Sequence, residues 1–188
     1  ARQARATEEE YSLARAMRSE AGSRGTRAEK VAIGWTVWNH ARFKGWTITR
    51  LLTWAEGRPS GLYGQQNQGR YAGTAADPEA EDLAVARDIL SGRAPDPTGG
   101  CGRKFFEPAL QDDLVARRHP GYTCDAACIA NRWQGDGWRP VAVPSTPKWQ
   151  FFCKGAVAAP VFARGGPTLA GAWLPGGLLF LGGGALLW

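Results

Sequence analysis

The spacing of apolar and polar residues over the first 100 positions is typical of helices. Thr7 and Glu10 are three residues apart, the spacing of a capping box, in which each side chain binds the backbone amide of the other residue. Thr26 and Glu29 repeat this arrangement, and Gly22 separates the two segments. The pattern therefore predicts one helix from Thr7 to Gly22 and a second helix that begins after Thr26.

The second helix is apolar on nearly all sides over residues 31–41, which is typical of a buried central helix. A third helix is predicted over about 47–56, and the stretch 58–74, rich in Gly, Gln, Ser and Tyr, is expected to be an irregular loop. Asp77 resembles an N-cap because a proline follows it at the first helical position. The fourth helix is therefore predicted to run from there to Leu90.

In the second half of the chain, proline and glycine residues interrupt the regular spacing of apolar and polar residues. The pattern predicts a turn over 95–100, a strand over 104–106, and short helices near 110–118 and 125–132. The fold class that follows is α+β, mainly α, with a small turn-rich β region. We expect the folded domain to occupy residues 1–155.

Residues 156–188 form an apolar, glycine-rich tail, in which no charged side chain follows Arg164. As a helix, residues 165–188 would reach about 36 Å, and a bilayer core is about 30 Å thick. Trp173 and Trp188 would then lie near the two interfaces. Three interpretations stay open, which are insertion into a membrane, packing into an assembly such as a virion, and a flexible end.

Composition and charge narrow the classes of partner. Hydrophobic residues make up 44% of the chain and charged residues 21%, which excludes a wholly disordered protein. The net charge of +6 favours polyanionic surroundings, namely nucleic acid, anionic lipid or the acidic polymers of a bacterial envelope. Because basic and acidic residues are mixed along the chain, we do not expect nucleic acid as the partner.

The cysteines all lie in the second half of the chain, at positions Cys101, Cys124, Cys128 and Cys153. An even number in a loop-rich region favours disulfides and an oxidising compartment, with free thiols and a zinc site as the alternatives. The zinc alternative is disfavoured because Cys124 and Cys128 have three residues between them, and His40 and His119 are too far apart in sequence to form a ligand pair. The spacing does not determine the connectivity, and no metal or other cofactor is expected.

Glu20 is the acid whose position suggests chemistry. Leu13, Met17 and Glu20 follow at i, i+4 and i+7, so the carboxyl group ends the apolar face of the first helix. Apolar neighbours tend to raise the pKa of a carboxyl group, as a general acid near neutral pH requires. The alternatives are a solvated side chain or an ion pair with Arg18 or Arg24.

Four segments resemble a known family. The run "YSLARAMRSEAGSRGTRAEKVAIGWTVWNHAR", then "ADPEAEDLAVARDILSG", "DPTGGCGRKFFEP" and "KWQFFCK" occur in this order. Together they are similar to the motifs of the spore cortex-lytic type of bacterial cell wall hydrolases, over roughly residues 8–153. The resemblance implies a lysozyme-like fold and cleavage of peptidoglycan glycan strands. It also implies that Glu20 is the catalytic acid of a lytic transglycosylase-like reaction, in which the 6-hydroxyl group of the sugar closes a 1,6-anhydro ring.

The remaining candidate site residues would bind substrate, and each also has a structural interpretation. Gln68 and Tyr71 lie where the family has a "QFS"-like loop, and Tyr71 would stack on a sugar or simply close the loop. Phe105 and Phe106 alternate along a strand, so one is expected to face the cleft and the other the core. The last two candidates, Gly99 and Gly100, would form a turn.

A two-carboxylate mechanism would need a second acid about 5 to 9.5 Å from the first. Glu56, Asp77 and Glu107 are the alternatives, although each is also explained as a helix-terminal, capping or loop residue. The chain departs from the family in four places. The "QFS"-like loop of the family appears only as Gln68-Gly69-Arg70-Tyr71, and the segment 109–148 is longer. Gln150 replaces a frequent histidine, and Glu107 stands where asparagine is usual.

Two functions of different classes follow. The first is an enzyme that cleaves peptidoglycan in a bacterial cell envelope or from a phage virion, with residues 165–188 as its contact with a membrane or a virion assembly. The second is a non-catalytic peptidoglycan-binding or structural component of an envelope or phage assembly.

Overall fold

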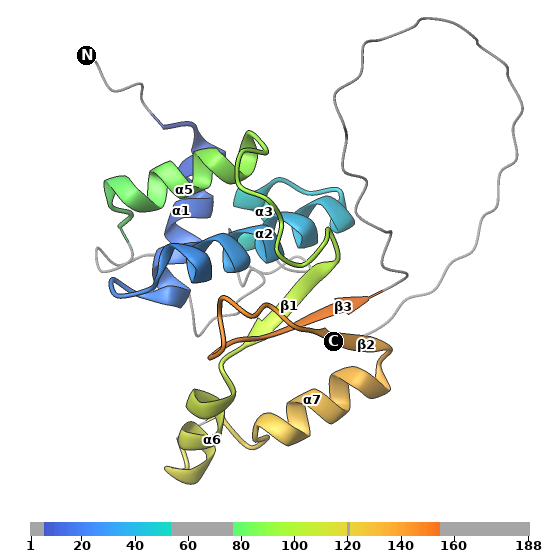
Figure 1. The fold of residues 1–188 in the computed structure, drawn as a ribbon. Helices are drawn as coiled ribbons and strands as arrows, with labels where there is room; N and C mark the ends of the chain where they lie inside the picture. Colours follow the sequence, from blue (N-terminus) through green and yellow to red (C-terminus); the bar gives the residue numbers. More distant parts are fainter. Residues whose placement is uncertain (1–5, 54–76, 120, 155–188) are drawn as a thin grey trace, which may run out of the picture.

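A helical layer made by the first half of the chain supports a small sheet made by the second half (Figure 1). The computed structural model of the protein describes residues 6–53, 77–119 and 121–154. The helices of the first half are α1 (Glu8–Ala21), α2 (Arg27–Lys44), α3 (Ile48–Thr53) and α5 (Ala80–Leu90). Helix α1 packs against α2, α3 and α5, so these helices share one core. The mainly helical α+β class predicted from the sequence is confirmed.

Helices α1 and α2 begin where the capping boxes predicted. The Thr7 amide donates to Glu10 Oε2 at 3.0 Å and the Glu10 amide donates to Thr7 Oγ1 at 3.2 Å. At the start of α2, the Thr26 amide donates to Glu29 Oε2 at 2.7 Å and the Glu29 amide donates to Thr26 Oγ1 at 3.3 Å. Gly22 ends α1 with φ of 71°, a conformation that glycine adopts without strain.

Helix α5 begins two residues later than predicted, so the assignment of Asp77 as its N-cap is wrong. The N-cap is Glu79, whose amide donates to Asp82 Oδ2 at 2.9 Å. Asp77 instead accepts from Arg15 of α1 at 2.7 Å. The carboxylate of Asp77, which the local sequence suggested as a helix cap, therefore forms an ion pair with a distant helix instead.

The sheet has the order β1-β3-β2 and is antiparallel throughout. Its strands are β1 (Gly102–Phe106), β2 (Trp138–Val141) and β3 (Gln150–Lys154). Helices α6 (Pro108–Ala116) and α7 (Ala126–Gly135) lie between β1 and β2 in sequence, close to the predicted short helices. Helix α2 packs on β1 and α7 packs on β2, so the sheet links the helical core to the α6–α7 hairpin.

The helical core is closely packed at Gly34 of α2. A methyl group at this position would lie 2.5 Å from Ile89 Cδ1 of α5 and 2.7 Å from Met17 Sδ of α1. Both distances are shorter than van der Waals contact, so the missing side chain lets three helices approach one another. Met17 and Ile89 are fully buried there.

All four cysteines form disulfides, as the even number favoured. Cys101 pairs with Cys153, and Cys124 pairs with Cys128. The first bond joins the start of β1 to its neighbour β3, and the second lies at the start of α7. None of the helices within 6–53, 77–119 and 121–154 is long and apolar enough to cross a bilayer. Residues 156–188, where the tail was predicted, lie outside the described residues.

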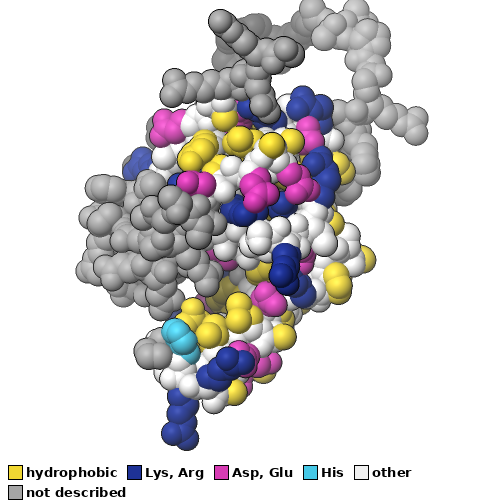
Figure 2. Space-filling model, turned by 90° about the vertical axis from the view of Figure 1, so that its left-hand side faces the viewer, with side chains coloured by type: hydrophobic (Ala, Val, Ile, Leu, Met, Phe, Trp, Pro, Cys, Tyr) yellow, Lys and Arg dark blue, Asp and Glu magenta, His cyan; other side chains and the backbone are white. Residues whose placement is uncertain are grey.

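Charged side chains of both signs are interspersed over the face shown in Figure 2. In the described residues, ion pairs join Arg15 of α1 to Asp77, which precedes α5, and Arg27 of α2 to Asp88 of α5. On the face shown in Figure 2, acidic and basic side chains are mixed, as they are along the sequence.

Candidate functional site

Glu20 lies in the last turn of α1, at the edge of the helical core. Met17 and Leu13, one and two turns earlier on the same face, are fully buried. Glu20 itself is half-buried, and its Oε1 atom is enclosed by protein. The carboxyl group therefore continues the apolar stripe to the point where the core meets the surface.

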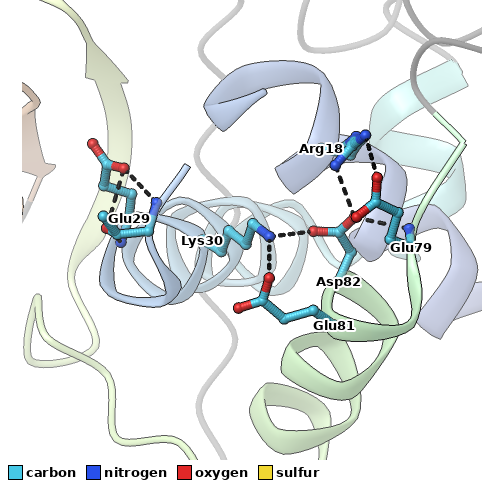
Figure 3. A network of polar contacts seen from close by, with 7 residues as sticks. Arg18, Glu29, Lys30, Glu79, Glu81 and Asp82 are labelled. Atoms are coloured by element: carbon cyan, nitrogen blue, oxygen red, sulfur yellow. Dashed lines mark hydrogen bonds and ion pairs between the residues drawn. The ribbon is translucent and has the colours of Figure 1, made fainter. Parts of the chain in front are cut away.

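Arg18, one of the two arginines considered as an ion-pair partner of Glu20, is engaged by acids at the start of α5. Its Nη2 lies 2.7 Å from Glu79 Oε1, and its Nη1 lies 3.9 Å from Asp82 Oδ2 (Figure 3). Residues two apart in a helix point about 200° apart, so Arg18 and Glu20 leave α1 on opposite sides. The Arg18 side of α1 therefore contacts the start of α5.

The "DPTGG" segment folds into a turn that is fixed to α2. Asp96 Oδ2 accepts from Asn39 Nδ2 at 2.7 Å and from the Gly100 amide at 3.0 Å. Asp96 Oδ1 accepts from the amide and the hydroxyl group of Thr98, both at 2.7 Å. Gly99 and Gly100 have φ of 66° and 84°, which explains glycine at both positions. Both glycines therefore form a turn, as the sequence predicted.

Two more contacts hold this segment on α2. Trp35 Nε1 donates to the carbonyl oxygen of Ala94 at 3.1 Å, and His40 Nδ1 lies 2.9 Å from the carbonyl oxygen of Arg103. His40 is buried, and burial is the main reason that its pKa is lowered, with nearby Lys44, Lys104 and Arg103 lowering it further and the Arg103 carbonyl opposing. These contacts determine where β1 begins relative to α2.

Phe105 and Phe106 face opposite sides of the sheet, as alternation along a strand predicted. Phe105 contacts Trp149 and Phe151 on the side of the helical core, with ring centroids 5.5 and 6.0 Å away. Phe106 contacts Trp133 of α7 at 5.4 Å and Phe152 at 6.0 Å. Both rings are half-buried in these clusters, and their role in substrate binding stays a prediction.

The start of α2 is tied to the segment before β3 through Glu29. Glu29 Oε1 accepts from Trp149 Nε1 at 3.3 Å and lies 3.1 Å from Lys148 Nζ. Burial acts to raise the pKa of Glu29, but hydrogen bonds from Thr26 and Lys148 outweigh it and lower the pKa below its ordinary value. Because Trp149 also touches Phe105, the α1–α2 corner that follows Glu20 is linked to β1 by one chain of contacts.

The candidates for the second acid of a two-carboxylate mechanism lie in different parts of the chain. Asp77 is held by Arg15, as described above, and Glu107 is the N-cap residue of α6. Glu56, Gln68 and Tyr71 lie outside the described residues. Within the described ranges, no group of three or more His, Cys, Asp or Glu side chains could hold a metal ion.

Sequence reasoning missed two of the residues that build this region. Asp96 organises the turn on α2, and its signal was the Asp-Pro-Thr-Gly pattern, in which an aspartate side chain typically binds backbone amides two or more residues ahead. Trp149 reaches Glu29, which is 120 positions away, and no local pattern could have indicated that contact.

No protein-family description, curated protein or solved structure matches this chain. The resemblance to cell wall hydrolases therefore depends on the quoted motifs alone.

Proposed function

We propose that this protein cleaves the glycan strands of peptidoglycan, with Glu20 as the acid and then the base. The observation that carries the proposal is the position of Glu20, half-buried in the last turn of α1 with Oε1 enclosed. Burial disfavours the charged form of a carboxyl group, and so does the negative end of the helix dipole. The proposed role requires Glu20 to carry a proton that it can donate to the substrate.

The reaction needs one carboxyl group that acts twice. Protonated Glu20 would donate its proton to the glycosidic oxygen as the bond to the sugar C1 breaks. The resulting carboxylate would then remove a proton from the 6-hydroxyl group of the same sugar, whose oxygen bonds to C1 and closes the 1,6-anhydro ring. A water molecule in place of the hydroxyl group would give simple hydrolysis instead.

The arrangement of the other motif segments supports the same proposal. The α2 part of the first motif segment and the third motif segment (96–108) are joined by the bond from Asn39 to Asp96 and by the contact of His40 with the Arg103 carbonyl. The closing segment forms β3, which pairs with β1 of the third motif. Motifs far apart in sequence are thus neighbours in space, as residues of one site need to be. A lysozyme-like arrangement of this helical layer and sheet is part of the proposal.

The test is release of soluble fragments from purified peptidoglycan by the full chain. Glu20→Gln is expected to lower the rate at least about 100-fold, the range for loss of a general acid. Glu8→Gln, an exposed acid in the first turn of the same helix, is the matched control and should retain full activity. Mass spectrometry of the fragments then distinguishes anhydro ends from hydrolysed ends. Undiminished release by Glu20→Gln, with unchanged melting temperature, would exclude this mechanism.

A non-catalytic peptidoglycan-binding or structural role is the second candidate. The observation that favours it is the α6–α7 hairpin, which carries a disulfide and has no fully buried residue in either helix. Such a segment contributes solvent-exposed surface more than it contributes to a buried core. This role predicts that the chain sediments with peptidoglycan while no fragments are released, for the wild type and for Glu20→Gln alike.

A further inference from the structure

A cluster of cations and aromatic rings lies at the end of the sheet where β1 begins and β3 ends. We name it the sheet-end patch, and its members come from the last turn of α2, from β1, from β2 and from β3: Arg42, Phe43, Lys44, Arg103, Lys104, Trp138 and Lys154. In Figure 1 these segments meet on the side of the sheet from which the chain leaves β3. None of these residues belongs to the candidate site around Glu20.

Direct contacts hold the patch together. The guanidinium carbon of Arg103 lies 4.1 Å from the ring centroid of Phe43, and Arg103 Nη1 donates to the carbonyl oxygen of Lys154 at 3.0 Å. Lys104 Nζ and Lys154 Nζ lie 4.6 and 5.4 Å from the ring centroid of Trp138. Aromatic faces thus hold three of the cations in place.

The positive charges in the patch are close enough to act on one another. The pKa of Lys104 is lowered, mainly by burial, and Lys154, Arg132 and Lys44 add to the effect while Asp136 opposes it. Lys44 and Lys104 also lower the pKa of His40. Cations that repel one another in this way lower the free energy of unfolding, so an anion bound here would relieve the repulsion.

The sequence that follows the patch indicates which kind of anionic partner the patch binds. Lys154 is the last described residue, and the 24 residues after Arg164 contain no charged side chain. A bilayer with anionic lipids offers phosphate groups for the cations and an apolar interior for the sequence that follows them. Nucleic acid would supply phosphate groups for the cations but no apolar surroundings for the sequence that follows them. Phe43, 56% exposed beside Arg103, is a further apolar group suited to the interface.

We propose that the sheet-end patch binds the surface of a membrane that contains anionic phospholipids. The patch and the apolar tail then act as two signals, the first recognising headgroup charge and the second the apolar interior. This docking does not depend on catalysis, so Glu20→Gln should bind vesicles as the wild type does.

The experiment is co-sedimentation of the full chain with vesicles of phosphatidylcholine alone or with about 30% phosphatidylglycerol at physiological salt. The patch variant is Arg42→Gln/Lys44→Gln/Lys154→Gln, and the matched control removes three exposed cations elsewhere, Arg24→Gln/Arg117→Gln/Arg118→Gln. The wild type and the control should bind the anionic vesicles more tightly than the neutral ones. The patch variant should bind the anionic vesicles about 100-fold more weakly than the wild type, because each of its three lost cations contributes about fivefold to binding of such a surface.

Three results would overturn the proposal. The first is equal binding of anionic vesicles by the patch variant and the wild type, with circular dichroism showing that both are folded. The second is an equal loss in the control variant, which would mean that only net charge matters. The third is tighter binding of a DNA duplex than of anionic vesicles, lost in the patch variant, which would make the patch a nucleic-acid site.

Discussion

His40 is a residue whose single proton should influence the stability of the fold. Its ring is buried between α2 and β1, with Nδ1 at 2.9 Å from the Arg103 carbonyl oxygen. Burial, and then the charges of Lys44, Lys104 and Arg103, lower its pKa below the ordinary value of 6.5. The folded protein therefore favours the neutral ring, whereas the unfolded chain binds a proton at pH values just below 6.5.

The sign of the pH dependence follows from that difference. As the pH falls below 6.5, the unfolded state gains a proton that the folded state does not, so the free energy of unfolding decreases until the folded pKa is reached. His40→Gln should show a weaker pH dependence between pH 7.5 and 5 than the wild type in urea unfolding. His119→Gln, which changes an exposed histidine, is the control. An identical slope in His40→Gln and the wild type would contradict this assignment.

At the scale of elements, α2 is joined to α5 by a buried ion pair. Lys30 is 1% exposed and Asp82 is fully buried. Lys30 Nζ lies 2.8 Å from Asp82 Oδ1 and 2.9 Å from Glu81 Oε2 (Figure 3). Arg18 approaches the same Asp82 from α1, so one carboxylate connects three helices. Removing one partner of such a pair leaves a buried charge without compensation.

Lys30→Met is therefore expected to lower the free energy of unfolding by about 3 kcal/mol. The matched control is Lys148→Met, which removes the same group from an ion pair with Glu29 whose lysine side chain is 42% exposed. The control should cost about 1 kcal/mol or less, since solvent reaches the lysine of this pair and Glu29 keeps its hydrogen bonds with Thr26 and Trp149. Urea unfolding of the two variants measures the difference, and equal losses would show that burial of Lys30 does not matter.

At the scale of the whole molecule, the Cys101–Cys153 disulfide closes the part of the chain that carries α6, α7 and β2. The two cysteines are 52 positions apart and lie on the neighbouring strands β1 and β3. A loop of this length restricts the unfolded chain strongly, which the chain-entropy estimate puts at about 4 kcal/mol. Cys124–Cys128 closes a loop with a separation of only 4 and restricts the unfolded chain far less.

Replacing the first pair by Cys101→Ala/Cys153→Ala should thus lower the free energy of unfolding by about 2 to 4 kcal/mol. Cys124→Ala/Cys128→Ala is the control and should lower it by a smaller amount. Thermal unfolding followed by circular dichroism, under non-reducing conditions, measures both. A larger loss in the control would mean that the second disulfide, rather than the first, holds the molecule together.

Sequence patterns predicted the helical half of the fold well because its signals are local. The capping boxes of Thr7 and Thr26 each involve partners three positions apart, and they form regardless of the rest of the chain. Asp77 shows the limit of such reasoning, since Arg15, which is 62 positions away, binds its carboxylate. For the candidate site, the position of Glu20 at the end of an apolar helix face was predictable, whereas the contact of Trp149 with Glu29 was not.

The sequence by itself determined the starts of α1 and α2, the end of α1, and the alternation of Phe105 and Phe106 on a strand. Only the tertiary structure decided which cysteines pair, and that Asn39 binds Asp96 across 57 positions. It also brought together, in the sheet-end patch, cations that are mixed with acids along the chain. The physical reason is range, because backbone geometry relates residues within about four positions, whereas partners that are distant along the chain meet only after the core has formed.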